Sequence, residues 1–468
     1  MKTFNSPFRL IVLLAGLGLA QAATAATAAE PPEPAPPKPF TLPETMEMQL
    51  DNGLEATLVP YGSLPKVTVQ VAVRTGNLNE GEKRWLADFT SALLQEGTVN
   101  RSAQEIAGAV AAMGGEIFVS TGVDETVIGG DVLAEFAPDL IKLLAEITRS
   151  PAFPESEAER IRGDLLRQLD VMQSQPQATA QEAFSESTYG KHPYGDIFPS
   201  AEQLQGYTAA DAREFHEQEF GAKRTHVYVA GVFDEAAVRE AIREAFGDWK
   251  PGPEVLVNVP ESTPEHRVIL VDRPGAPQST LILGLPVVDP SHPDFVPLQV
   301  MNALLGGSFG SRITSNIRED KGYTYSPRST LQDNYRVATW AEYADVTTAH
   351  TADSIHEILK EIQRLQKEPP PEAELDGIKN YLSGVFVLQN SSRGSIIGQL
   401  RNIELHGLSE DYLSTLVQRI NAVTPETVSA MAREYLPIDD LTLVVVGDLE
   451  TVKPQLQELD WIREGDLK

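Results

Sequence analysis

The sequence predicts an α+β protein made of two related halves, and two observations support this prediction. Segments with the apolar spacing of helices and segments with the alternation of strands follow one another without the strict order of a doubly wound sheet. Matching segments also recur at nearly one offset: Gly231 and Gly447, each after an apolar run, lie 216 residues apart, and the Ala-Leu-Leu runs at Ala92 and Ala303 lie 211 apart. Such offsets indicate a duplicated domain of about 200 residues.

The first half, residues 42–250, contains clear periodic segments. Alternating valines over 67–73 predict a half-buried strand, and apolar residues at helical spacing over 82–96, closed by Gly97, predict a helix. The remaining predicted elements are helices over 103–113, 136–148 and 155–173, strands over 116–120, 126–132 and 226–231, and a helix that buries Val238, Ile242 and Phe246.

The second half, residues 266–468, repeats this plan after a linker. Pro251, Pro253 and Pro260 punctuate residues 251–265 and predict a connection without regular structure. The predicted elements of the second half are strands over 268–271, 280–285 and 441–447, and helices over 294–305 and 354–365.

The N-terminus predicts export. Residues 1–22 have a positive start, a short apolar run and a small-residue cleavage site, which is the form of a signal peptide. Residues 23–41, rich in Ala and Pro, predict an extended leader. The apolar run is too short to predict a membrane span, and without cysteine the chain has no lipid-bearing residue at the cleavage site. We expect a periplasmic or secreted protein with no integral span in the mature chain.

Composition excludes some classes of function. The chain has 468 residues with 41% hydrophobic residues, so large cores are expected. Lys and Arg number 38 against 67 Asp and Glu, which gives a net charge of −29. This balance argues against a nucleic-acid binder and against tight association with an anionic membrane.

The stretch from Asn302 to Pro327 contains the candidate functional residues. An apolar run leads into a glycine-rich turn with Gly306, Gly307 and Gly310, where the backbone can approach a neighbour closely. Arg318 and Tyr325 follow, the tyrosine in a Tyr-Thr-Tyr run that predicts the start of a strand. A guanidinium and a phenol near such a turn can hold and polarise a carbonyl.

A structural interpretation of this stretch competes with the functional one. Arg318 can pair with Glu319 or Asp320 on a solvated helix face, and Tyr325 can belong to the core. Composition alone favours this structural interpretation.

The motifs LLGGSFGSR and IREDKGYTYS resemble the C-terminal half of pitrilysin/insulinase-type zinc metallopeptidases. The resemblance extends over nearly the whole mature chain. It implies two related α+β domains, each a mainly antiparallel sheet packed with helices. It also implies that Arg318 and Tyr325 contact the substrate near the scissile bond.

The catalytic motif of that family is missing. Its active members carry His-x-x-Glu-His on the first-half helix, where the histidines bind zinc and the glutamate is the general base. The resemblance places these residues on Asp88, Ser91 and Ala92, and the third zinc ligand on Gln168. All four positions lack the required chemistry, and none of the eight histidines forms a helical pair three or four residues apart. We therefore expect no catalytic residue and no zinc in this chain.

A rival prediction comes from Gly306-Gly-Ser308-Phe-Gly310, which fits the Gly-x-Ser-x-Gly pattern of a serine hydrolase. That motif requires a strand before the serine, whereas the preceding residues have helical spacing.

The resemblance implies a partner. The family contains pairs in which one chain holds the zinc helix and the other keeps only the arginine–tyrosine element. The sequence therefore predicts a non-catalytic, substrate-binding subunit of a heterodimer, or of a dimer of heterodimers, with zinc in the partner chain. The alternatives are a peptide-binding or scaffold homodimer that has lost peptidase function, and a serine hydrolase that uses Ser308.

Overall fold

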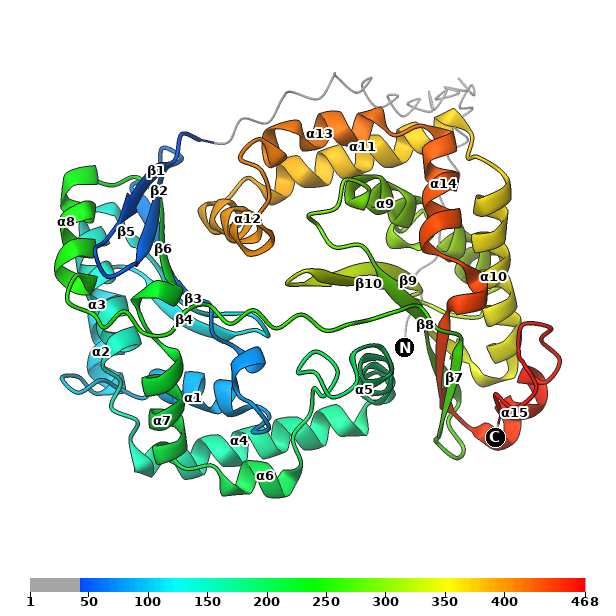
Figure 1. Ribbon diagram of the computed structural model, residues 1–468, viewed down its shortest axis with the longest axis horizontal. Coiled ribbons are helices and arrows are strands. Elements are labelled where there is room, and N and C mark those ends of the chain that lie inside the picture. The colour runs from blue at the N-terminus through cyan, green and yellow to red at the C-terminus, as the bar shows by residue number, and fades with distance from the viewer. Residues whose placement is uncertain (1–42, 468) are drawn as a thin grey trace, which may run out of the picture. The chain divides into compact units, whose positions relative to one another are not determined.

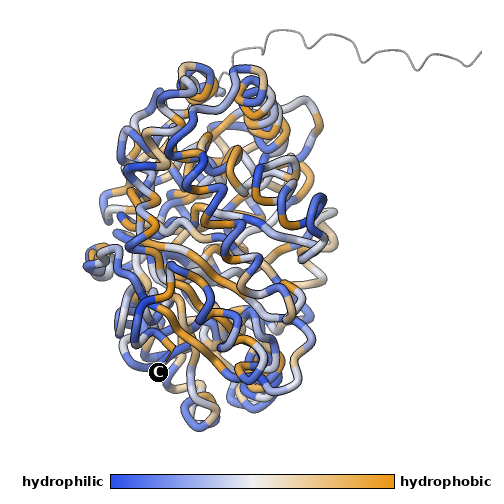
Figure 2. The backbone as a smooth tube through the Cα atoms, turned by 90° about the vertical axis from the view of Figure 1, so that its right-hand side faces the viewer, coloured by the Kyte–Doolittle hydropathy of each residue, from blue (hydrophilic) through white to orange (hydrophobic). Residues whose placement is uncertain are grey.

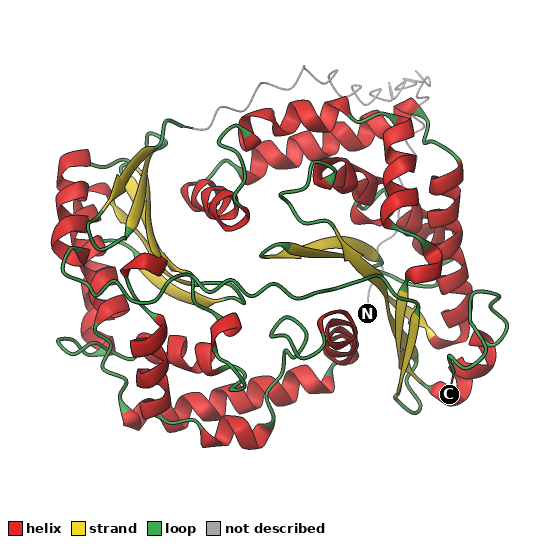
Figure 3. Ribbon diagram, viewed as in Figure 1, coloured by secondary structure: helices red, strands yellow, loops and turns green. Residues whose placement is uncertain are grey.

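The computed structural model describes residues 43–467, which belong to one compact unit. The predicted signal peptide (1–22) and leader (23–41) lie outside the described residues. Helices and strands are mixed along the chain and form two separate sheets, each packed with helices (Figures 1 and 3). The predicted α+β fold class is confirmed.

The two sheets share one strand order. The first is β1-β2-β6-β3-β5-β4 and the second is β7-β11-β8-β10-β9. Only β2 with β6, and β7 with β11, run parallel; the other neighbours run antiparallel. Apart from β1, the orders match strand for strand, as duplication predicts. The strands are β1 Met46–Gln49, β2 Glu55–Pro60, β3 Lys66–Val73, β4 Glu116–Thr121, β5 Thr126–Leu133, β6 Thr225–Gly231, β7 Arg267–Asp272, β8 Gln278–Val287, β9 Arg328–Asn334, β10 Val337–Thr347 and β11 Thr442–Gly447.

The helices divide between the halves in chain order. The first half has α1 Leu86–Leu94, α2 Ala103–Ala112, α3 Ala137–Arg149, α4 Glu155–Ser174, α5 Pro176–Tyr189, α6 Ala201–Gly206, α7 Ala209–Glu219 and α8 Glu235–Phe246. The second has α9 Phe295–Asn302, α10 Thr351–Lys367, α11 Glu372–Gln389, α12 Arg393–His406, α13 Tyr412–Ala422, α14 Pro425–Tyr435 and α15 Leu449–Leu456.

Two predicted helices have different bounds in the structure. The helix predicted over 82–96 begins only at Leu86, because Trp85 adopts a left-handed conformation (φ 61°). The Glu80 carboxylate accepts the backbone N–H groups of Trp85 and Ala87, which fixes the start of α1 there. The helix predicted over 294–305 changes after Asn302 into a wider π-helical turn, Ala303–Gly307. Such turns are frequent at functional sites.

Each sheet is covered on one face by a helix from the opposite half. Helix α12 of the second half packs on β3 and β6, and α5 of the first half packs on β8 and β11. Ile396 and Ile397 of α12 join a buried cluster with Tyr228. Phe184 of α5 joins one with Ile282 and Val444. Because β3 corresponds to β8 and β6 to β11, the exchange is reciprocal and interlocks the two halves.

This exchange corrects the prediction of a half-buried strand over 67–73. The alternate residues Thr68 and Gln70 are also buried, at 7% and 6% exposure. Arg393 and Arg401 of α12 lie over them: Arg393 Nε donates to Thr68 Oγ1 (3.2 Å), and Arg401 Nη1 donates to Gln70 Oε1 (3.2 Å). The polar face of the strand is satisfied by a helix rather than by water.

The remaining features are simple. Residues 251–265 form neither helix nor strand. Hydrophobic stretches lie mostly in the interior of the described part of the protein, and hydrophilic stretches dominate its outer turns (Figure 2). Among residues 43–467, no helix combines the length and the apolar character that crossing a membrane requires.

Candidate functional site

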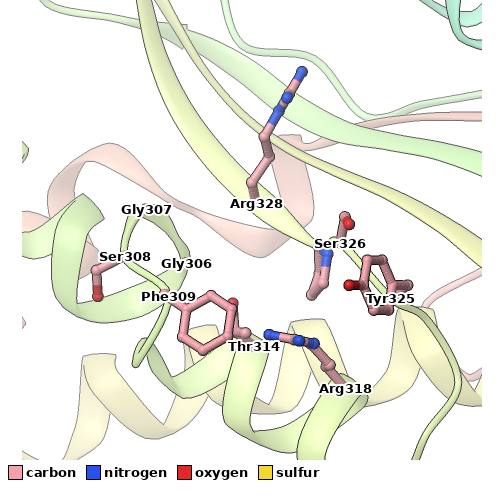
Figure 4. A pocket seen from close by; sticks show the side chains of 10 residues that line it. Gly306, Gly307, Ser308, Phe309, Thr314, Arg318, Tyr325, Ser326 and Arg328 are labelled. Atoms are coloured by element: carbon pink, nitrogen blue, oxygen red, sulfur yellow. The ribbon is translucent and has the colours of Figure 1, made fainter.

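The candidate residues of the second half surround one cavity of about 290 Å³ (Figure 4). Its wall comes from the turn after α9, from a π-helical segment at Thr314–Asp320, and from the loop that leads into β9. The lining residues are Gly306, Gly307, Ser308, Phe309, Thr314, Arg318, Tyr325, Ser326, Pro327 and Arg328. The structure therefore brings Arg318, Tyr325 and two of the three predicted glycines together, and leaves out Gly310.

Close packing explains glycine at two of these positions. A Cβ atom on Gly306 would lie 2.5 Å from Ser329 Oγ and 2.6 Å from Glu342 Oε2. A Cβ atom on Gly307 would lie 2.6 Å from Asn302 Nδ2. At Gly310 a Cβ atom would meet nothing within 4 Å, so the predicted close approach is wrong there.

Buried polar groups hold the turn against the second sheet. Asn302 Oδ1, at the end of α9, accepts from Ser329 Oγ (2.6 Å) and from Trp340 Nε1 (2.8 Å). Glu342 of β10 lies under Gly306 and is 1% exposed. Burial raises the pKa of Glu342 well above its usual range, against a backbone hydrogen bond from Arg328 and the charge of that residue.

Arg318 lies between two exposed aromatic rings. Its guanidinium carbon is 4.3 Å from the centre of the Phe309 ring and 5.1 Å from that of Tyr325. Figure 4 shows the Arg318 side chain between the Phe309 and Tyr325 rings. Phe309 is 75% exposed and Tyr325 is 80% exposed. Stacking between aromatic faces orients a guanidinium while its N–H groups remain free to donate.

The structure decides part of the choice between the functional and the structural interpretation. The predicted pair of Arg318 with Glu319 exists at 3.4 Å, with the Arg318 side chain half-buried and that of Glu319 exposed. A core position for Tyr325 is wrong, because its side chain is exposed. The Tyr-Thr-Tyr run also does not start a strand: β9 begins at Arg328.

Sequence reasoning missed Phe309. Its ring stacks on Arg318 although it lies nine residues away in the chain. The available signal was an aromatic residue in the middle of a glycine-rich turn, where the local chain offers nothing to bury it.

Ser308 lacks the geometry of a hydrolase nucleophile. It follows α9 and the π-helical turn, so no strand precedes it as the motif requires. Its hydroxyl is buried and has no hydrogen-bond partner among residues 43–467. No general base therefore contacts it in the described part of the chain.

The positions that correspond to the zinc site lie on α1 and α4, two helices that pack together. Asp88 accepts a hydrogen bond from Asn77 Nδ2 (2.7 Å), and Ser91 accepts one from Thr121. Ala92 offers no ligand atom, and Gln168 is exposed. These residues do not fit a zinc ion, and the polar ones on α1 are already occupied by protein donors. That the chain binds no zinc here stays a prediction.

Glu80 gives this region a pH dependence. Burial raises the pKa of Glu80 to about 7 against its hydrogen bonds from Ala87, Asn77 and Trp85, and the Asp88 carboxylate adds to the rise. The folded pKa lies above the unfolded one, so the folded state binds the proton more tightly. This stabilisation is complete below about pH 4.5 and is lost as the pH rises through about 7.

We expect Glu80→Gln to flatten the pH dependence of stability. Urea unfolding of the unmutated chain should show a free energy that falls from pH 5 to pH 8, and the variant should lose roughly 2 kcal/mol of that fall. Glu82→Gln, an exposed neighbour, is the matched control and should keep the full slope. Equal slopes in Glu80→Gln and the unmutated chain would show that Glu80 does not titrate between pH 5 and pH 8.

The described residues form two related α+β halves, and Arg318 and Tyr325 line one cavity in the second half. Comparison with family models identifies the family: "Insulinase (Peptidase family M16)" matches residues 61–198, and "Peptidase M16 inactive domain" matches residues 206–382. Together they span more than half of the chain. The chain belongs to the M16 peptidase family, the insulinase/pitrilysin family of zinc metallopeptidases.

Relatives match almost end to end. The chain is 25% identical to "Uncharacterized zinc protease YmxG" of Bacillus subtilis over 85% of this chain and 96% of that protein. It is 24% identical to mitochondrial-processing peptidase subunit beta of Mus musculus, over 90% and 89%. It is 22% identical to "Non-peptidase homolog YmxG" of Helicobacter pylori, over 82% and 90%.

A solved structure supports the fold. The peptidase M16 inactive domain from Pseudomonas fluorescens superposes with a TM-score of 0.80 at 22% identity, covering 86% of this chain and 98% of that one.

Proposed function

We propose that this chain is the non-catalytic, substrate-binding subunit of an exported, heteromeric zinc peptidase. One observation carries the proposal: Arg318 and Tyr325 line one cavity, where Tyr325 is exposed and the Arg318 side chain is half-buried, while Asp88, Ser91 and Ala92 occupy the positions of the catalytic motif. The chain keeps the residues that hold a peptide and lacks those that hydrolyse it. Hydrolysis then takes place at zinc in a partner chain of the same family.

The site suits a peptide backbone. The Arg318 guanidinium, oriented by Phe309 and Tyr325, offers planar N–H donors to carbonyl oxygens. The Tyr325 hydroxyl lies at the surface, where it can donate to a neighbouring carbonyl. The exposed rings also give apolar contact to substrate side chains.

Two relatives support the two parts of this proposal. The mouse relative is a subunit of a processing peptidase, and the Helicobacter relative is named a non-peptidase homolog. Export rests on the sequence of residues 1–22. The alternative is a peptide-binding homodimer without any peptidase partner.

We expect the purified chain to cleave no peptide by itself. The reason is that Asp, Ser, Ala and Gln at positions 88, 91, 92 and 168 replace the two histidines, the general base and the third zinc ligand of the catalytic motif. Peptide cleavage should arise when a family member with an intact His-x-x-Glu-His motif from the same organism is added, and a chelator should abolish it.

Cleavage by the chain alone that a chelator removes would contradict the non-catalytic role. A chain that forms homodimers and gains no activity with any such partner would support the homodimer alternative instead.

A further inference from the structure

Three potential metal ligands converge where α12 of the second half covers the first sheet. Glu55 of β2 lies opposite His226 of the parallel neighbour β6, and Glu404 of α12 faces both. His226 Nδ1 lies 2.8 Å from Glu404 Oε2 and 3.8 Å from Glu55 Oε2. Among residues 43–467 this is the one group of three potential ligands whose donor atoms all lie within 4.8 Å of one another. It is separate from both the cavity at Arg318 and the positions on α1.

Hydrogen bonding on the far side of the ring sets the orientation of His226. Thr57 Oγ1 donates its single proton to Glu47 Oε2 (2.7 Å) and lies 2.8 Å from His226 Nε2. Since the hydroxyl proton is already used, Nε2 must carry the hydrogen and donate to Thr57. In the neutral ring, the lone pair is therefore on Nδ1, which faces the two carboxylates.

Nδ1 faces Glu404 at ion-pair distance but makes no hydrogen bond of good geometry. The atom is buried and has no hydrogen-bond partner among residues 43–467, although Glu404 Oε2 lies 2.8 Å away. The His226 side chain is only 11% exposed. Two carboxylates that converge on one imidazole nitrogen need a positive charge between them, which either a proton on Nδ1 or a bound cation supplies.

Neighbouring residues hold His226 and Glu404 in place on both sides of the imidazole ring. Tyr228 stacks on His226 with ring centres 4.1 Å apart and donates its hydroxyl proton to Glu404. Two linked hydrogen bonds, between Glu47 and Thr57 and between Thr57 and His226, fix the imidazole on the other side. Hydrogen bonds of this kind hold metal ligands in place and raise their affinity.

We propose that Glu55, His226 and Glu404 bind one first-row divalent cation of the Zn²⁺ class, with water completing the shell. One imidazole nitrogen and two carboxylate oxygens form a donor set that suits such an ion. Because the ligands come from two strands of the first half and one helix of the second, the ion joins the halves. The ion has a structural role, and peptide hydrolysis takes place in the partner chain.

The test is zinc titration of the full-length chain against a competing fluorescent chelator. The unmutated chain should bind one Zn²⁺, His226→Gln should lower the affinity at least about 100-fold, and Thr57→Val about 10–100-fold. Glu55→Gln is the variant least able to disturb folding, because Glu55 is exposed, and it should also weaken binding. His350→Gln is the matched control: His350 is an exposed histidine that also pairs with a carboxylate, Asp353, and its loss should change nothing.

A second measurement distinguishes an ion that holds the two halves together from an ion that binds weakly at the surface. Zinc should slow amide hydrogen exchange in α12 and β6 of the unmutated chain and not in His226→Gln. Absence of zinc binding, or equal affinity in His226→Gln, would overturn the proposal. If His226→Gln still binds zinc and Asp88→Asn does not, the result also contradicts the non-catalytic role. If His226→Gln binds no zinc and the unmutated chain cleaves no peptide, the result supports both the metal site and the non-catalytic role.

Discussion

Tyr325→Phe and Arg318→Ala should each lower kcat/KM of the reconstituted heteromeric peptidase while the chain stays folded and bound to its partner. The scissile carbonyl carries more negative charge in the transition state than in the ground state, so donors aimed at it accelerate the reaction. Removing one such donor typically lowers the rate about 10²–10³-fold when it meets the oxyanion, and less when it only positions the backbone.

Tyr325→Phe is the sharper variant, because it deletes one hydroxyl and keeps the ring that stacks on Arg318. Tyr381→Phe is a suitable control, since Tyr381 is another half-exposed tyrosine of the second half, outside the Arg318 cavity. Unchanged kcat/KM in both Tyr325→Phe and Arg318→Ala would show that the stretch is only a structural turn.

Phe184→Ala should lower the free energy of unfolding by about 3–5 kcal/mol, the usual effect of deleting a buried phenylalanine. Phe184 of α5 is 2% exposed and lies against the second sheet with Ile282 and Val444. Its ring also fills the space over Gly284, where a Cβ atom would come within 2.9 Å of it. The loss removes apolar contact between the two halves and leaves a cavity.

Urea unfolding with an unchanged m-value measures this effect. Phe309→Ala is the matched control, because Phe309 is 75% exposed and its removal should change stability little. A loss below about 1 kcal/mol for Phe184→Ala would mean that α5 does not fix the halves together.

The sequence predicted local elements well because local patterns determine them. Apolar alternation gave the strands around residues 66–73 and 225–231, and helical spacing gave α3, α4, α8 and α10. The nearly equal offsets of 216 residues, between Gly231 and Gly447, and 211 residues, between Ala92 and Ala303, indicated the repeated strand order that both sheets show. Helix bounds failed where a side chain outside the predicted helix decides them, as Glu80 does for α1.

The exchange of helices could not be predicted in the same way. The pattern of α12 shows an apolar face, but not that this face lies on β6, about 170 residues earlier in the chain. For the same reason, the sequence around His226 did not predict its contact with Glu404. The sequence around Tyr325 did not predict that its ring is exposed beside Arg318. The burial of Thr68 and Gln70 also follows from this exchange alone.

The most direct test of the substrate-binding role is one peptide-cleavage assay on three samples: this chain alone, this chain with its zinc-bearing partner, and Tyr325→Phe with the same partner. We expect no cleavage in the first sample, full cleavage in the second and a large loss of kcat/KM in the third. Chelator-sensitive cleavage by the chain alone, or equal rates in the second and third samples, would contradict the account.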